Sequence, residues 1–441
     1  MTQTTEPAEP HLQPNADVVP PVRSAASRRF AIGLLAIVVV AAAVRITYTV
    51  FVADDLPLGG DAVSYHLQAA HLAAGNGYVR AQDFLVFGPS AEFPPLFPVV
   101  LSVVDRFGGD SITTQRLFTG MLGVGTVLLV GLTGRRVGGS TVGLIAAGLA
   151  AIYPMLFGAE GALMAESLYA LLVSGFLLVV YLALERPTIV RWVVAGVLIG
   201  LAALTRTEAI LLVPLVVVPE VLRRGGITAR AWSTIGLSTV AALVVVTPWI
   251  VRNAVVFDRF IPISNNSGTL LAGANCDGTY DGDDRGLWHF ACVTAVDTTG
   301  VDEAEMADRL RESGLDYARD HLSEVPGVMT VRVLRTFGLY EPTQQIEWEE
   351  LEGRDAGWQT VGHRMFLVLL PFAVAGTVLL WRARRPVWPL LAPVVAVVLT
   401  SAFSYGNQRF RILAEPGMLI LAAVPLAALM DRLRVGFDKP R

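Results

Sequence analysis

The residue best suited to chemistry is Asp61, in the segment Gly59 to His66 that follows the first long apolar stretch, residues 30–52. Desolvating a carboxylate beside a membrane costs several kcal/mol unless something compensates, so such a residue is a functional candidate. Tyr65 and His66 follow within the same helix-like segment and are candidate substrate-binding residues. The alternative role for Asp61 is to cap that helix, since aspartate is a good N-cap.

A second carboxylate, Glu166, lies near the outer end of a predicted span at 163–184, where its charge is equally costly. Its alternative role is an ion pair with Arg206 or another buried arginine. Arg206 and Glu208 are two residues apart, so a helix would not bring them face to face. At a turn we expect them to reach different partners, with at least one in a structural salt bridge to a neighbouring helix.

Three further arginines, Arg252, Arg409 and Arg411, emerge at the predicted outer ends of apolar spans. They break the positive-inside rule, so an anionic group must hold them there. Lipid headgroups are the simplest partner, and the phosphate of a lipid substrate is the more specific one. The planar guanidinium suits phosphate because it bonds two oxygens at once.

The elements that position these residues are membrane-spanning helices. The chain is 53% hydrophobic and 16% charged, against about 25% charged residues in soluble proteins. A bilayer needs about 20 apolar residues per helix, and the sequence predicts about ten such spans. They are 30–52, 111–133, 141–158, 163–184, 191–205, 208–222, 232–250, 361–381, 386–403 and 411–430.

Arginine pairs and clusters such as Arg28 with Arg29 and Arg135 with Arg136 fall on one side of these spans. The positive-inside rule makes that side cytoplasmic, together with both termini. The predicted organisation follows the chain. It comprises a disordered cytoplasmic tail at 1–29, a transmembrane module at 30–252 with a first outer loop at 53–110, an extracytoplasmic loop domain at 253–360, C-terminal transmembrane helices at 361–431, and a cytoplasmic tail at 432–441.

The two outer segments leave room for chemistry on the outer face. Residues 93–104 are apolar but too short to cross, so we expect a helix lying at the interface. The second outer loop is strongly acidic. Within it, 259–274 suggests a short hairpin or extended segment, whereas 302–321 and the stretch from Pro326 have helical spacing.

Cys276 and Cys292 are the only cysteines and lie in this second outer loop. In an oxidising compartment such a pair favours a disulfide that closes a short loop, and two free thiols are the alternative.

Several motifs together resemble one group of enzymes. They are the Asp61 segment, Glu92 to Pro98, Leu204 to Glu208, Pro248 to Asn253, and Asn265 to Asn275. In this order they resemble GT-C fold glycosyltransferases of the family 39 type, related to protein O-mannosyltransferases and lipid A aminoarabinose transferases. The resemblance covers roughly residues 30–430. It implies an all-α polytopic membrane protein with helical juxtamembrane segments.

The resemblance also implies roles. Asp61 matches the catalytic aspartate base, Glu166 a second acid that orients the acceptor, and Arg252 the arginine that holds the donor phosphate. Arg409 and Arg411 contribute to the same task. Protein O-mannosyltransferases follow the aspartate with glutamate, whereas this chain has Ala62, which makes a protein acceptor less favoured.

The expected function is inverting transfer of a hexosyl or pentosyl group from a polyprenyl-phosphate donor to an acceptor hydroxyl on a lipid, polysaccharide or protein. The transfer needs a base for the hydroxyl and positive charge for the departing phosphate. No histidine or carboxylate spacing demands a metal, so we expect no cofactor, and a weakly bound divalent cation stays open. The basic residues follow orientation, so no nucleic-acid partner is expected.

Two other classes compete with the enzyme. A transporter or flippase for a lipid-linked sugar also has many spans and intramembrane charges. Transporters usually show internal repeats and charges near the bilayer midplane. Here the unusual charges lie toward one face and no repeat is visible, which favours the enzyme. A membrane protein without catalysis is the third class.

Overall fold

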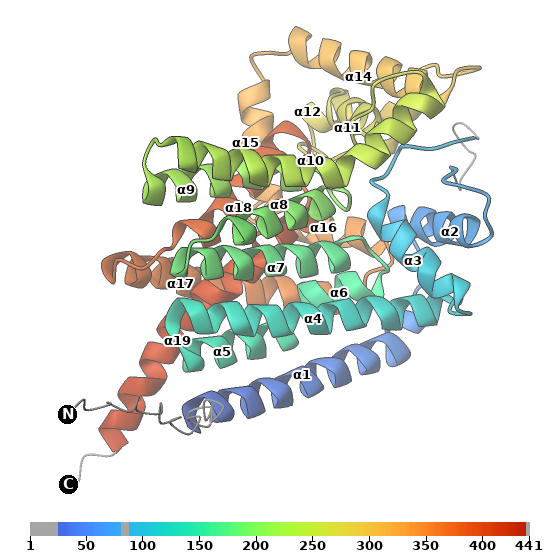
Figure 1. Ribbon diagram of the computed structural model, residues 1–441. Coiled ribbons are helices and arrows are strands. Elements are labelled where there is room, and N and C mark those ends of the chain that lie inside the picture. Colours follow the sequence, from blue (N-terminus) through green and yellow to red (C-terminus); the bar gives the residue numbers. More distant parts are fainter. Residues whose placement is uncertain (1–24, 81–87, 438–441) are drawn as a thin grey trace, which may run out of the picture.

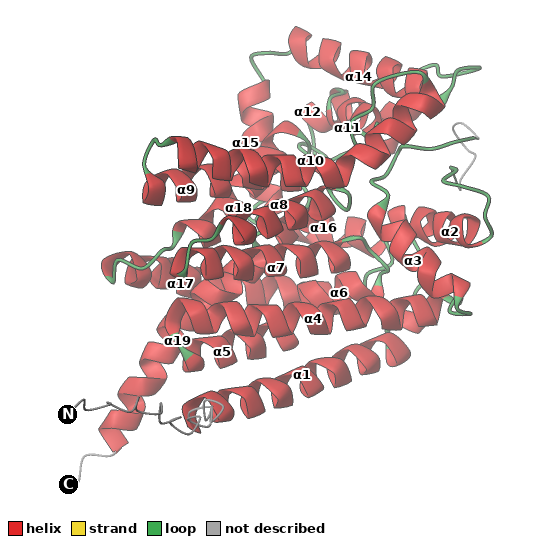
Figure 2. Cartoon of the chain, in the orientation of Figure 1, coloured by secondary structure: helices red, strands yellow, loops and turns green. Residues whose placement is uncertain are grey.

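The computed structural model describes residues 25–80 and 88–437, and these are almost entirely helical (Figures 1 and 2). Within the described residues, the only pairing of the β type is an isolated bridge between Val79 and Pro89. The predicted all-α fold class is therefore confirmed.

A bundle of long helices makes up most of the molecule, and its members run roughly side by side in Figure 1. Helices α4 and α5 pack closely, as do α8 and α10, and α17 and α19. The bundle consists of α1 (Ala25–Phe51), α4 (Ile112–Gly138), α5 (Ser140–Ala151), α6 (Pro154–Gly161), α7 (Glu166–Glu185), α8 (Ile189–Ala203), α9 (Val218–Gly225), α10 (Ala229–Phe257), α17 (Ala356–Arg382), α18 (Trp388–Phe403) and α19 (Glu415–Phe437).

Membrane-spanning length is met by fewer helices than the sequence predicted. Among the described residues, 5 helices are long and apolar enough to cross a bilayer, namely those built on α1, α4, α7, α10 and α17. The pair α5 and α6, bent by 44° at its break, would make 6. Helices α8 and α18 are apolar but shorter. The membrane character of the chain is thus supported, and the count of ten spans is not confirmed.

The predicted span at 208–222 is broken rather than continuous. Its residues form a 3-10 turn (Thr207–Leu211), a π turn (Val213–Val217) and then α9. Pro214 and Pro219 explain the break, because proline lacks the N–H that a continuous helix requires.

A buried ion pair ties α1 to α6 inside the bundle. Arg45 Nε lies 2.7 Å from Glu160 Oε2, and both side chains are buried. Gly123 of α4 lies directly against this pair, since a Cβ there would come within 1.9 Å of Glu160 Oε1. Glu160 precedes the turn into α7, so the pair helps to fix the start of that helix.

The short helices gather around one end of the bundle, at the right and top of Figure 1. They are α2 (Asp61–Ala73), α3 (Leu96–Arg106), α11 (Ser267–Ala274), α12 (Asp277–Tyr280), α13 (Phe290–Thr294), α14 (Glu303–Asp320), α15 (Val325–Thr336) and α16 (Pro342–Glu350). The predicted interfacial helix corresponds to α3, and the two predicted amphipathic stretches correspond to α14 and α15.

The hairpin or extended segment predicted for 259–274 is wrong in its second half, where the chain forms α11. Gly268 of α11 lies so close to α14 that a Cβ would come within 2.4 Å of the Ala307 carbonyl oxygen. Tight packing of the two helices therefore overrides the local β preference of this segment.

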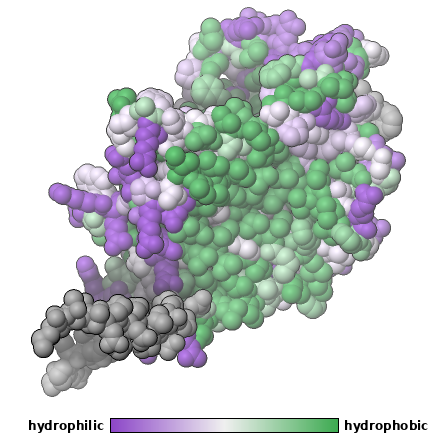
Figure 3. Space-filling view, in the orientation of Figure 1, coloured by the Kyte–Doolittle hydropathy of each residue, from purple (hydrophilic) through white to green (hydrophobic). Residues whose placement is uncertain are grey.

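The arginines predicted to share one face do gather at one end of the bundle. Arg135 lies over the Phe30 ring at 4.4 Å, and Arg385 donates to the Val137 carbonyl. The described start of α1 and the end of α19 lie at this same end (Figure 1). Figure 3 shows a broad apolar belt between this polar end and the polar outer helices.

Several helix ends fall a few residues from the predicted domain limits, and the division into domains stays a prediction. Helix α1 already begins at Ala25, inside the predicted tail 1–29, while residues 1–24 lie outside the described chain. Helix α10 continues to Phe257 and α17 begins at Ala356, so both cut into the predicted loop domain 253–360. Helix α19 runs to Phe437, inside the predicted tail 432–441.

Candidate active site

The centre of the candidate site is Arg409, whose side chain is only 5% exposed and contacts three carboxylates. Its Nη2 donates to Asp61 Oδ2 at 2.9 Å, its Nε to Glu166 Oε1 at 2.6 Å, and its Nη1 to Glu352 Oε1 at 2.7 Å. Arg409 lies in the short 3-10 segment Gln408–Leu413 that precedes α19. One guanidinium thus joins residues from four separate parts of the chain.

Asp61 is the first residue of α2, and its carboxylate faces Arg409 instead of capping the helix. The N-cap position is taken by Gly60 with φ of 50°, and no side chain caps this helix. A positive φ favours glycine, so Gly60 sets the sharp entry into α2. The N-cap interpretation of Asp61 is therefore wrong, and its side chain, 34% exposed, stays accessible to a ligand.

Glu166 is the first residue of α7, and its side chain is 1% exposed. Three arginines compensate its charge: Arg409 at 2.6 Å, Arg206 at 2.9 Å and Arg354 at 3.8 Å. The helix N-terminus also favours a negative charge there. Leu163, just before α7, adopts φ of 58°, so the turn that delivers Glu166 is held in a disfavoured conformation by its surroundings.

Arg206 and Glu208 bond each other, contrary to the prediction of different partners, whereas the predicted salt bridge to a neighbouring helix is confirmed by the contact of Arg206 with Glu166 of α7. Arg206 Nε lies 2.7 Å from Glu208 Oε1, while its Nη1 reaches Glu166. The reason is local: Arg206 is extended, with φ of −148° and ψ of 123°, and a 3-10 turn follows. The rule that residues two apart do not meet holds for helices, and this segment is not helical.

Sequence reasoning missed Glu352 and Arg354, which lie in the turn between α16 and α17. Arg354 also pairs with Glu349 at 3.0 Å. Burial raises the pKa of the Glu352 carboxyl to about 7; nearby Arg409 opposes this rise, and the charge of Asp61 adds to it. The only signal was Arg354 as the single basic residue beside an acidic run, which gave no indication of contact with Asp61.

The side chains of Tyr65 and His66 contact different parts of the protein although the two residues are adjacent in the chain. Tyr65 is buried against the rings of Phe93 and Phe97, both at 5.1 Å between centroids. Burial, together with the charges of Asp61 and Glu166, holds the pKa of Tyr65 well above its ordinary value. His66 instead contacts Gln115 at 2.8 Å on the side of α4, and the structure does not bring it to Arg409.

The structure does not bring Arg252 into contact with Arg409 or its carboxylates. Its Nη1 donates to the Ser90 carbonyl at 2.6 Å and its Nη2 to the Tyr78 carbonyl at 2.9 Å. It also lies over the Trp249 ring at 4.8 Å. These contacts tie the first outer loop to the end of α10, and the phosphate contact of Arg252 stays a prediction.

Arg411 is likewise separated from the Arg409 cluster. Its side chain is buried, lies over the Phe366 ring at 3.9 Å and reaches Glu415 of α19 at 3.3 Å. The structure therefore packs Arg411 between Phe366 and Glu415, and its phosphate contact stays a prediction.

A second buried charge cluster connects the two outer segments. Arg80 contacts Glu92 at 3.2 Å and Glu303 at 3.3 Å, and Asn265 Nδ2 donates to Glu303 at 2.8 Å. Burial raises the pKa of Glu92 from its ordinary value of 4.5 to about 7; Arg80 opposes the rise, and the charges of Glu303 and Asp61 add to it.

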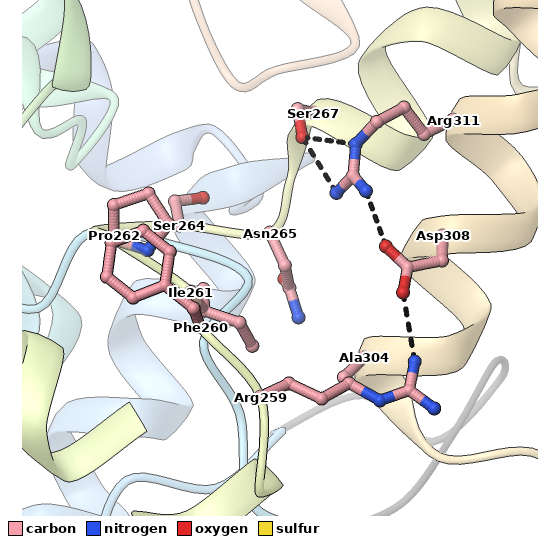
Figure 4. A pocket seen from close by; sticks show the side chains of 10 residues that line it. All are labelled: Arg259, Phe260, Ile261, Pro262, Ser264, Asn265, Ser267, Ala304, Asp308 and Arg311. Carbon is pink, nitrogen blue, oxygen red and sulfur yellow. Dashed lines mark hydrogen bonds and ion pairs between the residues drawn. The ribbon is translucent and has the colours of Figure 1, made fainter. Parts of the chain in front are cut away.

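The second outer loop contains a disulfide and a cavity. Cys276 and Cys292 are joined, with 6.4 Å between their Cα atoms. The cavity, of about 380 Å³, lies between α14 and the segment before α11 (Figure 4). Asp308 bonds both Arg259 and Arg311 at its edge. None of the predicted site residues lines this cavity, so it is separate from the Arg409 cluster.

Within the described part of the chain, no group of three or more histidine, cysteine, aspartate or glutamate side chains is arranged to hold a metal ion. The carboxylates around Arg409 are each bonded to arginine nitrogens instead.

Comparisons with known proteins agree with this fold. Residues 92–251 match the family model described as dolichyl-phosphate-mannose-protein mannosyltransferase. No curated protein matches the chain by sequence. The oligosaccharyltransferase of Archaeoglobus fulgidus, solved with a tethered acceptor peptide, has a TM-score of 0.53 and 15% identity, covering 91% of this chain and 50% of its own. This chain thus spans about half the length of that protein.

The same archaeal protein in its apo form gives a TM-score of 0.52 at 16% identity, covering 91% of this chain and 51% of that one. ArnT from Cupriavidus metallidurans, solved with undecaprenyl phosphate, has a TM-score of 0.41 at 15% identity, covering 93% of this chain and 80% of that one. The resemblance predicted from the sequence is confirmed at the level of the fold: the chain shares the GT-C fold of that oligosaccharyltransferase, and its residues 92–251 match the dolichyl-phosphate-mannose-protein mannosyltransferase model.

Proposed function

We propose that this protein is a membrane glycosyltransferase that moves a sugar from a polyprenyl-phosphate-linked donor to an acceptor hydroxyl. The observation that carries the proposal is the contact between the partly exposed Asp61 and the buried Arg409. It places a base and a positive charge side by side, and sugar transfer from a phosphate needs both. The matching family is described by a dolichyl-phosphate-mannose donor, which supports a polyprenyl phosphate here.

In the proposed reaction, the hydroxyl oxygen of the acceptor attacks the anomeric carbon of the donor sugar. An oxygen of Asp61 accepts the proton of this hydroxyl during the attack. The bond between the anomeric carbon and the phosphate oxygen breaks, and its electron pair leaves with the polyprenyl phosphate. The proton then passes from Asp61 to solvent, since the side chain is partly exposed. Asp61 is the catalytic residue in this scheme.

Arg409 and Arg206 stabilise the departing phosphate in this proposal. Arg409 is the arginine in direct contact with the base, and Arg206 reaches the same Glu166 oxygen. Glu166 acts as a positioning residue, because its contacts with three arginines hold their side chains together. The arginines supply the positive charge, so the proposal includes no cofactor.

Inversion at the anomeric carbon is part of the proposal. Retention would require a carboxylate that attacks the sugar and forms a covalent intermediate. Glu166 is 1% exposed and surrounded by arginines, so it is unsuited to that attack. The more exposed Asp61 serves as the base.

The site is proposed to face the outer side of the membrane. Asp61 follows α1, whose 27 residues extend about 40 Å from the arginine-rich end. With that end cytoplasmic by the positive-inside rule, both termini are cytoplasmic and the Arg409 cluster is extracytoplasmic.

The acceptor is a hydroxyl of a lipid, a polysaccharide or a protein. Ala62 occupies the position where protein O-mannosyltransferases have glutamate, and it is fully buried in an apolar cluster with Tyr65 and Phe97. That environment has no room for a charged side chain, which supports a non-protein acceptor.

The test is reconstitution in lipid vesicles with labelled polyprenyl-phospho-sugars and candidate acceptors. The proposal expects release of free polyprenyl phosphate in step with a new glycoside of inverted configuration, measured by NMR. Movement of intact lipid-linked sugar between leaflets, without release of polyprenyl phosphate, would overturn the proposal in favour of a flippase.

A further inference from the structure

We infer that Glu352 occupies the position of the donor phosphate on Arg409, so that donor binding requires this carboxylate and its turn, residues 351–355, to move away. The inference rests on the proposed function and deepens it, since it names the group that the donor must displace.

The guanidinium of Arg409 is already fully occupied by carboxylates. Its three nitrogen atoms donate to Asp61, Glu166 and Glu352. Three carboxylates therefore already share Arg409, and of these only Glu166 has further arginine partners. A phosphate that approached with all three in place would meet net negative charge, which disfavours an anion. One carboxylate must leave before Arg409 can stabilise a phosphate.

The other partners of each carboxylate and its place in the chain decide which one leaves. Glu166 is 1% exposed, and two more arginines contact it. Asp61 is fixed at the start of α2 and is needed as the base. Glu352 is 22% exposed and lies on a turn, and within the described part of the chain Arg409 is its only ion-pair partner. Among the described residues, no group donates a hydrogen bond to its second oxygen, Oε2. Asp61 and Glu352 each have Arg409 as a single arginine partner, and of these two Glu352 is the one that the proposed chemistry does not use.

The environment of Glu352 also makes its charge easy to lose. The charged groups that face it are Arg409, Arg354, Asp61 and Glu349, and burial is the largest cause that raises its pKa to about 7. A carboxyl with this pKa is neutral in a large fraction of molecules near neutral pH. A neutral carboxyl competes weakly for Arg409, so a phosphate can replace it.

The turn that carries Glu352 rests on the chain just before Asp61. A Cβ on Gly59 would come within 1.9 Å of the Leu351 carbonyl oxygen, and one on Gly353 within 2.6 Å of the Pro57 carbonyl oxygen. Only glycines permit this close contact of two backbones. Movement of the turn therefore opens the approach to Arg409 directly beside Asp61.

The experiment measures binding of a short polyprenyl monophosphate to the purified full chain in nanodiscs. Glu352→Gln is compared with wild type and with the matched control Glu350→Gln, an exposed glutamate two residues earlier. We expect about tenfold tighter binding for Glu352→Gln, because the competing state is depopulated. We expect no change for Glu350→Gln. Glu352→Ala, which removes the competing group entirely, should shift binding in the same direction.

A pH series separates this effect from titration of the phosphate itself. Wild-type affinity should rise more steeply than that of Glu352→Gln as the pH falls through about 7, because only the wild type loses a competing charge. If folded Glu352→Gln and Glu352→Ala bind the polyprenyl monophosphate no more tightly than wild type, the inference is overturned and Glu352 is a residue that holds Arg409 in place. The proposed function would still stand in that case if wild type releases polyprenyl phosphate. Failure of every protein to bind or release polyprenyl phosphate overturns both.

Discussion

Arg409 Nη2 bonds Asp61 Oδ2 at 2.9 Å although the two residues are 348 positions apart in the chain. The contact joins the first outer loop to the segment before the last helix. It also fixes the orientation of Asp61, the most exposed of the three carboxylates that contact Arg409. The candidate base is therefore held by the fold rather than left free on a loop.

Glu166→Gln should destabilise the protein by about 3–5 kcal/mol, because it removes the buried charge that three arginines share. Urea or thermal unfolding in detergent measures the change. The matched control is Glu185→Gln, which breaks the exposed pair with Arg136 and should cost about 1 kcal/mol or less. Equal stability of the two variants would contradict the central position given to Glu166.

Arg252→Ala should lower stability by about 1–3 kcal/mol, because the Ser90 and Tyr78 carbonyls lose their donor. The KM for the donor should stay within about twofold of wild type, since Arg252 lies apart from the Arg409 cluster. Arg259→Ala, at an exposed ion pair nearby, is the control. A higher donor KM with unchanged stability would restore the phosphate contact that the sequence predicted.

Removal of the disulfide should destabilise the second outer loop by about 3 kcal/mol, as expected for a closed loop of about 15 residues. The double variant Cys276→Ser with Cys292→Ser and the wild type in reductant should unfold at the same midpoint, below that of oxidised wild type. Unchanged midpoints in both would show that the link contributes nothing to stability.

Glu92 should make stability depend on pH in a defined direction. Its pKa is about 7 in the folded protein against an ordinary 4.5, so the folded state binds the proton more tightly. The stabilisation is fully present below pH 4.5 and is lost as the pH rises through 7. Between those values the unfolding free energy of wild type should fall by about 1–3 kcal/mol more than that of Glu92→Gln. Parallel curves for the two proteins would contradict this.

The sequence predicted the bundle well because apolar length is a local property. Long apolar stretches of the sequence coincide with five helices of the structure, namely α1, α4, α7, α10 and α17. It also selected Asp61, Glu166, Arg206 and Arg409, since charges beside a bilayer need an explanation. Their mutual contacts did not follow from spacing, because residues from α2, α7 and the segment before α19 meet only in the folded chain.

The site residues that the sequence did not reveal, and the contacts that it did not predict, also have physical explanations. Glu352 and Arg354 lie in an acidic loop where most charges are solvated, so nothing local distinguishes them. Arg252 and Arg411 were grouped with Arg409 because all three break the positive-inside rule. Backbone carbonyls satisfy the first and a glutamate on α19 satisfies the second. A charge rule identifies arginines that need a partner and cannot identify which partner they have.

The most direct test of the account is the rate of polyprenyl phosphate release by Asp61→Asn in reconstituted vesicles, with Asp55→Asn as a control at an exposed aspartate of the same loop. If Asp61 is the base, Asp61→Asn should lower turnover by about 100-fold or more while the protein still folds and binds the donor. Asp55→Asn should match wild type. Turnover by folded Asp61→Asn at the wild-type rate would contradict the role of Asp61 as the base.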